Sequence, residues 1–126
     1  MKRLPNNAIH KALVAFLREH TGLVVYDYVP QEAVLPFITL GTMTVQDKST
    51  KTEDMTHLSA HIHIYSNYKG RYEINSLAEK LINLFGSIQL DLSPDEFYVS
   101  AQGVYFYETY PEDEMGYSGV ITLEVL

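Results

Sequence analysis

Residues 57–85, HLSAHIHIYSNYKGRYEINSLAEKLINLF, contain the change of hydrophobic period that decides the fold class. In residues 57–65 apolar side chains occupy every second position, as in a strand with one buried face. Residues 66–70, SNYKG, are typical of a turn. Apolar side chains then recur at spacings of three and four, which predicts an amphipathic helix closed by Gly86. A strand and a helix that are each apolar on one side indicate an α+β protein.

The N-terminal residues predict another amphipathic helix, over 7–20. Its apolar stripe consists of Ile9, Leu13, Phe16 and Leu17. Asn6 or Asn7 can cap the start of this helix, and Gly22 supplies the left-handed residue that ends it.

Extended segments and a polar loop follow the first helix. Residues 23–29 are β-branched and aromatic and stop at Pro30, and residues 37–45 alternate around threonines, so both segments predict strands. Residues 46–56, QDKSTKTEDMT, hold almost no apolar side chain. We therefore expect a long loop there that is mobile in the free protein and carries binding function.

The C-terminal part predicts a connection and two further strands. Residues 87–96 form the connection, residues 97–110 a long strand, residues 111–116 a hairpin-type loop, and residues 117–126 the last strand. The predicted order is α-β-β-β-α-β-β. We expect a mostly antiparallel sheet of four or five strands with both helices packed on one face. The length suits one domain covering residues 1–126.

Composition excludes several classes of function. A formal net charge of −7 opposes general binding to nucleic-acid phosphates. The absence of cysteine excludes structural disulfides, thiolate zinc sites and a cysteine nucleophile. The N-terminus lacks the long apolar segment of a signal peptide, and no window is long and apolar enough to cross a bilayer. We expect a protein that is soluble and cytoplasmic where it is made.

The sequence offers only weak candidates for chemistry. The glycines form no phosphate-binding loop, and GYSGV around Ser118 misses the nucleophile-elbow spacing by one residue. His57, His61 and His63 share one strand face, so His61 and His63 could hold a metal together. Zinc needs a third protein ligand, and the spacing of the aspartates and glutamates does not identify one. We therefore expect no catalytic residue, no cofactor and no metal site.

Acidic and tyrosine-rich segments have ordinary explanations. Glu53-Asp54 and the group of Glu108 with residues 112–114 fit solvated loops. The tyrosines in question are Tyr98, Tyr105, Tyr107, Tyr110 and Tyr117. A base-stacking platform needs a basic groove, and this part of the chain is acidic. Packing in the core or at a protein interface is therefore favoured for them.

Two segments carry a resemblance to a known family. Residues 25–41, VYDYVPQEAVLPFITLG, place an aspartate and a proline after one strand and a second proline before the next. Residues 62–85 continue with a strand, an aromatic-Ser pair, a short turn with glycine and a helix. With the N-terminal helix, the chain resembles the small tail-completion (tail-terminator, or tail-to-head joining) proteins of long-tailed bacteriophages and prophages. The resemblance spans nearly the whole chain, most clearly residues 7–85. Tyr65 stands where family members usually have a tryptophan.

The resemblance implies a structural role without a catalytic residue. It implies a homo-oligomer, a hexameric ring that caps the tail tube, stops its polymerisation and docks the tail on the head. The partners implied are the tail tube protein and the head-tail connector proteins. DNA would pass through the ring without specific binding, which is consistent with the acidic balance of the chain. The protein would assemble in the host cytoplasm and then remain in the virion tail, without membrane contact.

Two alternative functions remain open at this stage. One is a small metal-dependent or ligand-binding enzyme that uses the sheet face of His61 and His63. The other is a generic protein-interaction module outside any virion.

Overall fold

The computed structural model describes residues 3–27, 29–31, 33–34, 36–49, 55–66, 71–97, 99–111 and 116–126. Within this part the elements are α1 (Asn6–Thr21), β1 (Val25–Tyr26), β2 (Phe37–Asp47), β3 (Thr56–Ser66), α2 (Tyr72–Ser87), the short 3-10 helix η1 (Ser93–Asp95), β4 (Gln102–Pro111) and β5 (Tyr117–Val125). The predicted order α-β-β-β-α-β-β is confirmed.

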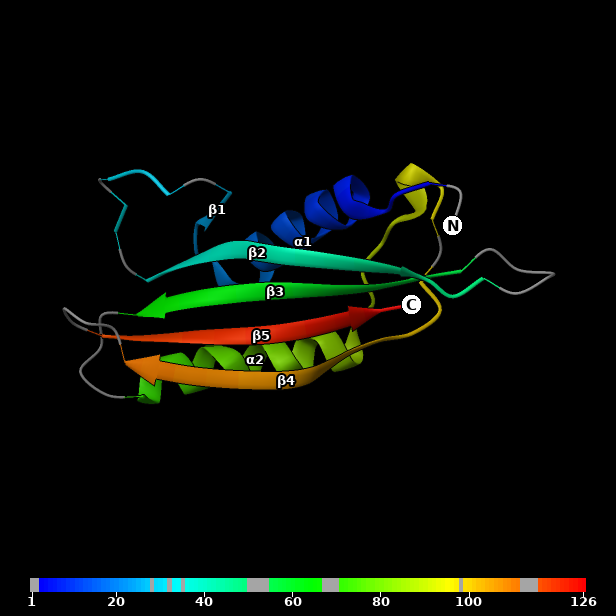
Figure 1. Ribbon diagram of the computed structural model, residues 1–126. Helices are drawn as coiled ribbons and strands as arrows, with labels where there is room; N and C mark the ends of the chain where they lie inside the picture. Colours follow the sequence, from blue (N-terminus) through cyan, green and yellow to red (C-terminus); the bar gives the residue numbers. More distant parts are fainter. Residues whose placement is uncertain are drawn as a thin grey trace.

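The strands form one five-stranded sheet in the order β1-β2-β3-β5-β4 (Figure 1). β1 runs parallel to β2, and the other neighbours are antiparallel, as the sequence predicted. β5 lies between β3 and β4, so the strand that carries the histidines is joined to the last strand of the chain. Irregularities interrupt the register between Leu40 and Met43 in β2 and between Val104 and Phe106 in β4.

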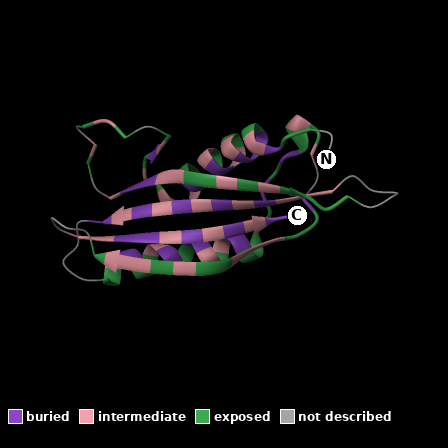
Figure 2. Cartoon of the chain, viewed as in Figure 1, coloured by how far each residue is buried: buried purple, intermediate pink, exposed green. Residues whose placement is uncertain are grey.

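Both helices cover the same face of the sheet (Figure 1). The ring of Phe16 in α1 stacks on the ring of Phe85 in α2, with centroids 4.8 Å apart. Along β3 the even-numbered residues from Leu58 to Ser66 are buried and the odd-numbered ones are only partly so. Figure 2 shows this alternation along β3 and β5. The main core side chains are Ile9, Leu13, Phe16, Leu17, Leu58, Ala60, Ile62, Ile64, Ile74, Ala78, Leu81, Phe85, Ile121 and Leu123.

The aromatic-Ser pair joins β3 to the start of α2. The hydroxyl of Ser66 is buried and donates to a carboxylate oxygen of Glu73 at 2.5 Å. Glu73 lies in the first turn of α2, where a negative charge also interacts favourably with the helix dipole. This bond helps to fix the direction in which α2 leaves the sheet.

The helix ends agree with the predictions in part. Gly22 ends α1 in the left-handed conformation, with φ of 71°, and its N–H donates to the carbonyl of Arg18. The predicted asparagine cap is wrong, because α1 begins at Asn6 after Pro5 and has no side-chain cap bond. The predicted stop at Gly86 is also wrong. α2 continues to Ser87, and Ile88 follows in an extended conformation.

The first predicted strand is shorter than expected. Of residues 23–29, only Val25 and Tyr26 form a strand, because this edge segment pairs with β2 alone. Its β-branched residues lie mostly outside the hydrogen-bond ladder, and Pro30 cannot donate to one.

Part of the predicted 46–56 loop belongs to strands, which corrects that prediction. β2 continues to Asp47 and β3 begins at Thr56, and these two residues pair with each other. Two hydrogen bonds extend the hairpin, because Lys48 N–H donates to the Met55 carbonyl and Met55 N–H donates to the side-chain hydroxyl of Ser49. Polar residues suffice here because backbone pairing needs no apolar side chain at an exposed hairpin end. Residues 50–54 lie outside the described residues.

The predicted strand over 97–110 begins later, at Gln102. The preceding η1 turn ends at Glu96, whose φ of 60° redirects the chain. Val99 is buried, and Ser100 donates its backbone N–H to the Leu126 carbonyl. Ala101 and Leu126 exchange backbone hydrogen bonds beside the Gln102–Val125 pair, so backbone pairing continues one residue before β4, while buried Val99 closes one end of the core.

Candidate functional site

Within the described part of the chain, one face of the sheet carries no helix, and we call it the open face (Figure 1). Cross-strand partners project from the same face of a sheet, so the register identifies its side chains. They include Phe37, Thr39, Thr44 and Gln46 of β2, His57, Ser59, His61, His63 and Tyr65 of β3, Ser118, Val120, Thr122 and Glu124 of β5, and Phe106, Glu108 and Tyr110 of β4. The three histidines that the sequence placed on one face are together on it.

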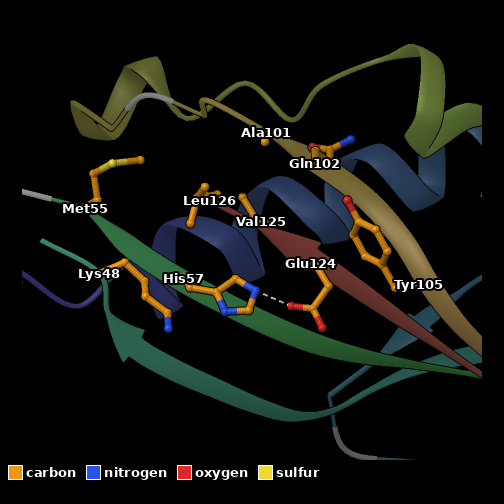
Figure 3. A pocket seen from close by; sticks show the side chains of 9 residues that line it. All are labelled: Lys48, Met55, His57, Ala101, Gln102, Tyr105, Glu124, Val125 and Leu126. Atoms are coloured by element: carbon orange, nitrogen blue, oxygen red, sulfur yellow. Dashed lines mark ion pairs between the residues drawn. The ribbon is translucent and has the colours of Figure 1, made fainter.

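A polar cluster links β3 to β5 on the open face. The carboxylate of Glu124 accepts a hydrogen bond from the hydroxyl of Ser59 at 2.7 Å and pairs with Nε2 of His57 (Figure 3). The side chains of His57 and Glu124 are only 30% and 24% exposed. In a nucleophilic triad the serine would bond to the imidazole, whereas here serine and imidazole both bind the carboxylate. The cluster therefore links β3 to β5 and does not activate the serine as a nucleophile.

A shallow hollow of about 590 Å³ lies beside this cluster (Figure 3). Apolar groups of Met55, Val125 and Leu126 line it together with the ring of Tyr105 and the side chain of Lys48. The ring of Tyr105 lies beside Gly103, 3.4 Å from the position that a Cβ would take there, which is ordinary van der Waals contact. The hollow combines an apolar lining with the ammonium of Lys48 and the carboxylate of Glu124, which suits a side chain or small group of mixed character.

A row of rings occupies the other end of the open face. The ring of His63 faces that of Tyr65 at 6.4 Å, Tyr65 contacts Phe37 at 5.1 Å, and Phe37 contacts Tyr26 edge-on at 5.4 Å. His63 also lies over Gly41, where a Cβ would come within 2.6 Å of its Nε2. These contacts pack the imidazole flat against the sheet.

The packing of His63 lowers its basicity. Removal from solvent lowers the pKa of His63, and the like charge of His61 lowers it further. Nδ1 of His63 is buried without a hydrogen-bond partner in the described part of the chain. The imidazole is thus held in a place that favours its neutral form.

The described residues place no third metal ligand beside His61 and His63. Among the described residues, no group of three or more histidine, aspartate or glutamate side chains could hold an ion. The carboxylate of Glu124 is engaged by His57 and Ser59. The expectation of no metal site stays a prediction that elemental analysis must test.

Ser118, the tyrosines and the acidic groups do not come together in one site among the described residues. Ser118 is buried in β5, and no helix follows it as an elbow would require. Tyr105 is exposed, whereas the hydroxyl of Tyr107 donates to Asn75 of α2 on the helix side at 2.8 Å. Tyr105 and Tyr107 therefore do not share one stacking platform. Of the acidic groups, Glu108 lies on the open face of β4, and residues 53–54 and 112–114 lie outside the described residues, as does Tyr98.

Sequence patterns did not reveal the grouping around Glu124. This residue, Lys48 and Tyr105 come from three separate segments that meet at the hollow. No local spacing signals their meeting, because it depends on which strands pair.

The fold and the open face define a two-layer α+β protein that offers a broad surface to other molecules. The chain belongs to the tail completion protein gp17 family, whose family model matches residues 7–126. The resemblance seen in the sequence is thereby confirmed. The family gives the chain a structural role in the tail of a bacteriophage.

Comparison with solved structures agrees with this fold. A chain of the "Virion of native gene transfer agent (GTA) particle" is 17% identical and superposes with a TM-score of 0.70. The match covers 94% of this chain and 90% of that chain. A comparison with curated protein sequences gave no match. Neither helix of the described part of the chain has the length and apolarity to cross a membrane.

Proposed function

We propose that this chain, as one domain over residues 1–126, caps the tail tube of a phage or prophage and joins the tail to the head. The family match over residues 7–126 carries this proposal. The similar chain from a gene transfer agent virion supports it, since that chain also belongs to a phage-like particle. The partners are the tail tube protein on one side and the head-tail connector proteins on the other.

The working form is a ring of copies, which we expect to be a hexamer. A ring forms when one surface of a protein binds a different surface of its neighbour and the rotation closes. The open face and the two sheet edges leave room for such contacts without unfolding any helix. The protein would assemble in the host cytoplasm and stay in the tail of the finished particle.

DNA would pass through this ring without specific binding. Among the described residues, the paired open-face positions of the strands carry two carboxylates, of Glu108 and Glu124, and the only cationic side chain beside them is Lys48 at the edge of the hollow. Phosphate contacts normally come from lysine and arginine, so this face offers little to hold a duplex. The chain carries a net charge of −7, which would repel DNA further.

Deleting the gene in a phage or lysogen that encodes this chain tests the proposal. We expect filled heads and separate tails in electron micrographs, and restoration of joined particles by the intact gene. Joined particles in normal number after deletion would contradict the proposal.

A matched variant separates the structural role from the enzyme alternative. The double variant His61→Ala/His63→Ala removes the histidine pair from the open face without touching the core. It should restore joining as well as the intact gene does. A variant that folds normally but fails to restore joining would favour chemistry or ligand binding at these histidines.

A further inference from the structure

The outer edge of β2 is open along most of its length. β1 pairs only with Ile38 and Thr39, whereas β2 runs on well past them (Figure 1). Beyond β1 the residues of β2 are exposed, except for Leu40, Met43 and Val45, which are partly buried. An edge strand of this kind presents backbone N–H and C=O groups with which another strand can pair.

The backbone groups of Met43 and Val45 face this open edge. Lys48 N–H donates to the Met55 carbonyl and so points toward the β3 side. Successive residues of a strand alternate in direction, so the even-numbered residues of this stretch point toward β3, and Met43 and Val45 point outward. The stretch is regular, because the irregularity of β2 lies between Leu40 and Met43. In the described part of the chain, these two outward residues make no backbone hydrogen bond to another strand or loop on that side.

β4 presents a second open edge on the opposite side of the sheet. Leu126 exchanges two backbone bonds with Ala101, so the even-numbered residues of β5 point toward β4. Their partners in β4 beyond its irregularity are also even-numbered. Tyr107 and Thr109 therefore point outward. Pro111 belongs to the same outward series, where its missing N–H costs no hydrogen bond of the sheet.

The two open edges match in strand direction and in side-chain face. Three antiparallel pairings lead from β2 to β4, so the two strands run in opposite directions. A second copy placed beside the first in the same orientation therefore brings its β4 antiparallel to β2. The outward residues of both strands carry their side chains on the helix side, since Met43 and Val45 pack against the core and Tyr107 bonds to Asn75 of α2. Opposite residues of an antiparallel pair share a face, so both copies keep their helices on one side of a continuous sheet.

The side chains on the open face are compatible with this pairing. In the two registers that pair Val45 with an outward residue of β4, either Thr44 or Gln46 lies opposite Glu108. A hydroxyl or an amide can donate to the carboxylate in either case. Phe106 is 55% exposed in the single chain, and a strand beside it would cover part of its ring.

We propose that residues 43–47 of one copy pair antiparallel with residues 106–111 of the next copy, so that the sheet continues from copy to copy. This inference rests on the proposed ring and assigns its subunit contact. Neither segment contains a lysine, a residue by which natural edge strands commonly avoid pairing. Each copy uses β2 for one neighbour and β4 for the other, and such a head-to-tail contact can close a ring.

Cross-linking in assembled particles tests the pairing. The natural chain has no cysteine, so Gln46→Cys/Phe106→Cys introduces the only two thiols, both on the open face. Within one copy β3 and β5 separate the two positions by about 14 Å or more, whereas paired edges bring them onto neighbouring strands. After complementation of the deletion strain, a short bismaleimide should give a ladder of linked copies on a denaturing gel. The matched control Leu4→Cys/Phe106→Cys, with Leu4 68% exposed and outside both edges, should give no ladder.

The outcomes of cross-linking separate the two proposals. Joined, infectious particles that contain the Gln46→Cys/Phe106→Cys chain but give no more ladder than the control would overturn the strand pairing and leave the tail role intact. Linked pairs in either single-cysteine variant, as many as in the double variant, would show that an edge pairs with itself and would also overturn the proposal. A deletion strain that joins heads and tails normally would instead overturn the tail role and the ring that rests on it.

Proline substitution tests the backbone bonds of the contact. Thr109 N–H points outward, so Thr109→Pro removes no bond within one copy, and edge strands tolerate proline at such positions. Far-ultraviolet circular dichroism should be unchanged, but multimers of the purified chain should be lost, or complementation should be lost if the free chain is monomeric. The matched control Thr109→Val keeps the N–H and should behave like the natural chain.

The comparison of these two variants has a clear contrary result. A Thr109→Pro chain that folds and still assembles, or an equal loss of assembly in Thr109→Val, would contradict pairing through the backbone of β4. If Thr109→Pro changes the circular dichroism spectrum, the cross-linking comparison decides.

Discussion

His57 of β3 and Glu124 of β5 meet across the open face, although they lie at the start of one strand and near the end of another. The Ser59 hydroxyl binds the same carboxylate, so one glutamate joins two side chains of the neighbouring strand. The cluster holds together the part of the sheet that borders the hollow.

Glu124→Ala should lower the free energy of unfolding by about 1–2 kcal/mol, because it removes the partly shielded contact with His57 and the hydrogen bond from Ser59. Denaturant titration would measure this change. Glu108→Ala, on exposed β4, is the matched control and should change stability by less than ~0.5 kcal/mol. Equal losses of stability for Glu124→Ala and Glu108→Ala would show that the contacts of Glu124 with His57 and Ser59 do not stabilise the fold.

Leu81→Ala should cost roughly 2–5 kcal/mol, because Leu81 is fully buried between α2 and the sheet. Thermal or denaturant unfolding would measure the loss. Lys80→Ala, at the neighbouring exposed position of the same helix, should be nearly neutral. A loss below ~1 kcal/mol for Leu81→Ala would mean that α2 does not pack as described.

Gly41→Ala and Gly86→Ala should have opposite effects. A Cβ on Gly41 would come within 2.6 Å of His63, so we expect a loss of about 1–3 kcal/mol. A Cβ on Gly86 meets nothing within 4 Å and lies in α2, so stability should rise by up to ~1 kcal/mol. The added variant His63→Ala should relieve much of the Gly41→Ala loss, and a strictly additive double variant would argue against the contact.

The lowered pKa of His63 predicts a pH dependence of stability. The folded chain binds fewer protons at this site than the unfolded chain does. The contribution of this site to the free energy of unfolding is therefore fully present at pH values above the ordinary pKa of 6.5, and it is lost as the pH falls below that value. His63→Gln should flatten this part of the stability profile.

The cause of that shift can be checked at the neighbouring histidine. His61→Ala should raise the pKa of His63 in an NMR titration, because it removes a like charge. An unchanged titration of His63 would leave burial as the sole cause.

Protein purified without added metal should contain no stoichiometric zinc or iron, because His61 and His63 lack a third ligand among the described residues. Elemental analysis is the measurement. About one metal per chain that disappears in His61→Ala/His63→Ala would contradict the prediction and favour the enzyme alternative.

The sequence by itself determined the features that depend on local periodicity. The alternation over residues 57–65 defined β3 and its buried face, and spacings of three and four defined both helices. Gly22 marked the end of α1, because an added side chain is unfavourable at its positive φ. These features are local, since each depends on the nearby chain and on one apolar side that must be buried.

Only the tertiary structure decided which strands pair and where each strand ends. β5 lies between β3 and β4, which brings Glu124 to His57 and Tyr105 to Lys48. Ser100 and Ala101 bond to Leu126 just before β4 begins, while polar Asp47 extends β2 because Thr56 lies opposite. Hydrogen bonds between distant segments depend on the partner that the whole chain supplies, so no local pattern encodes them.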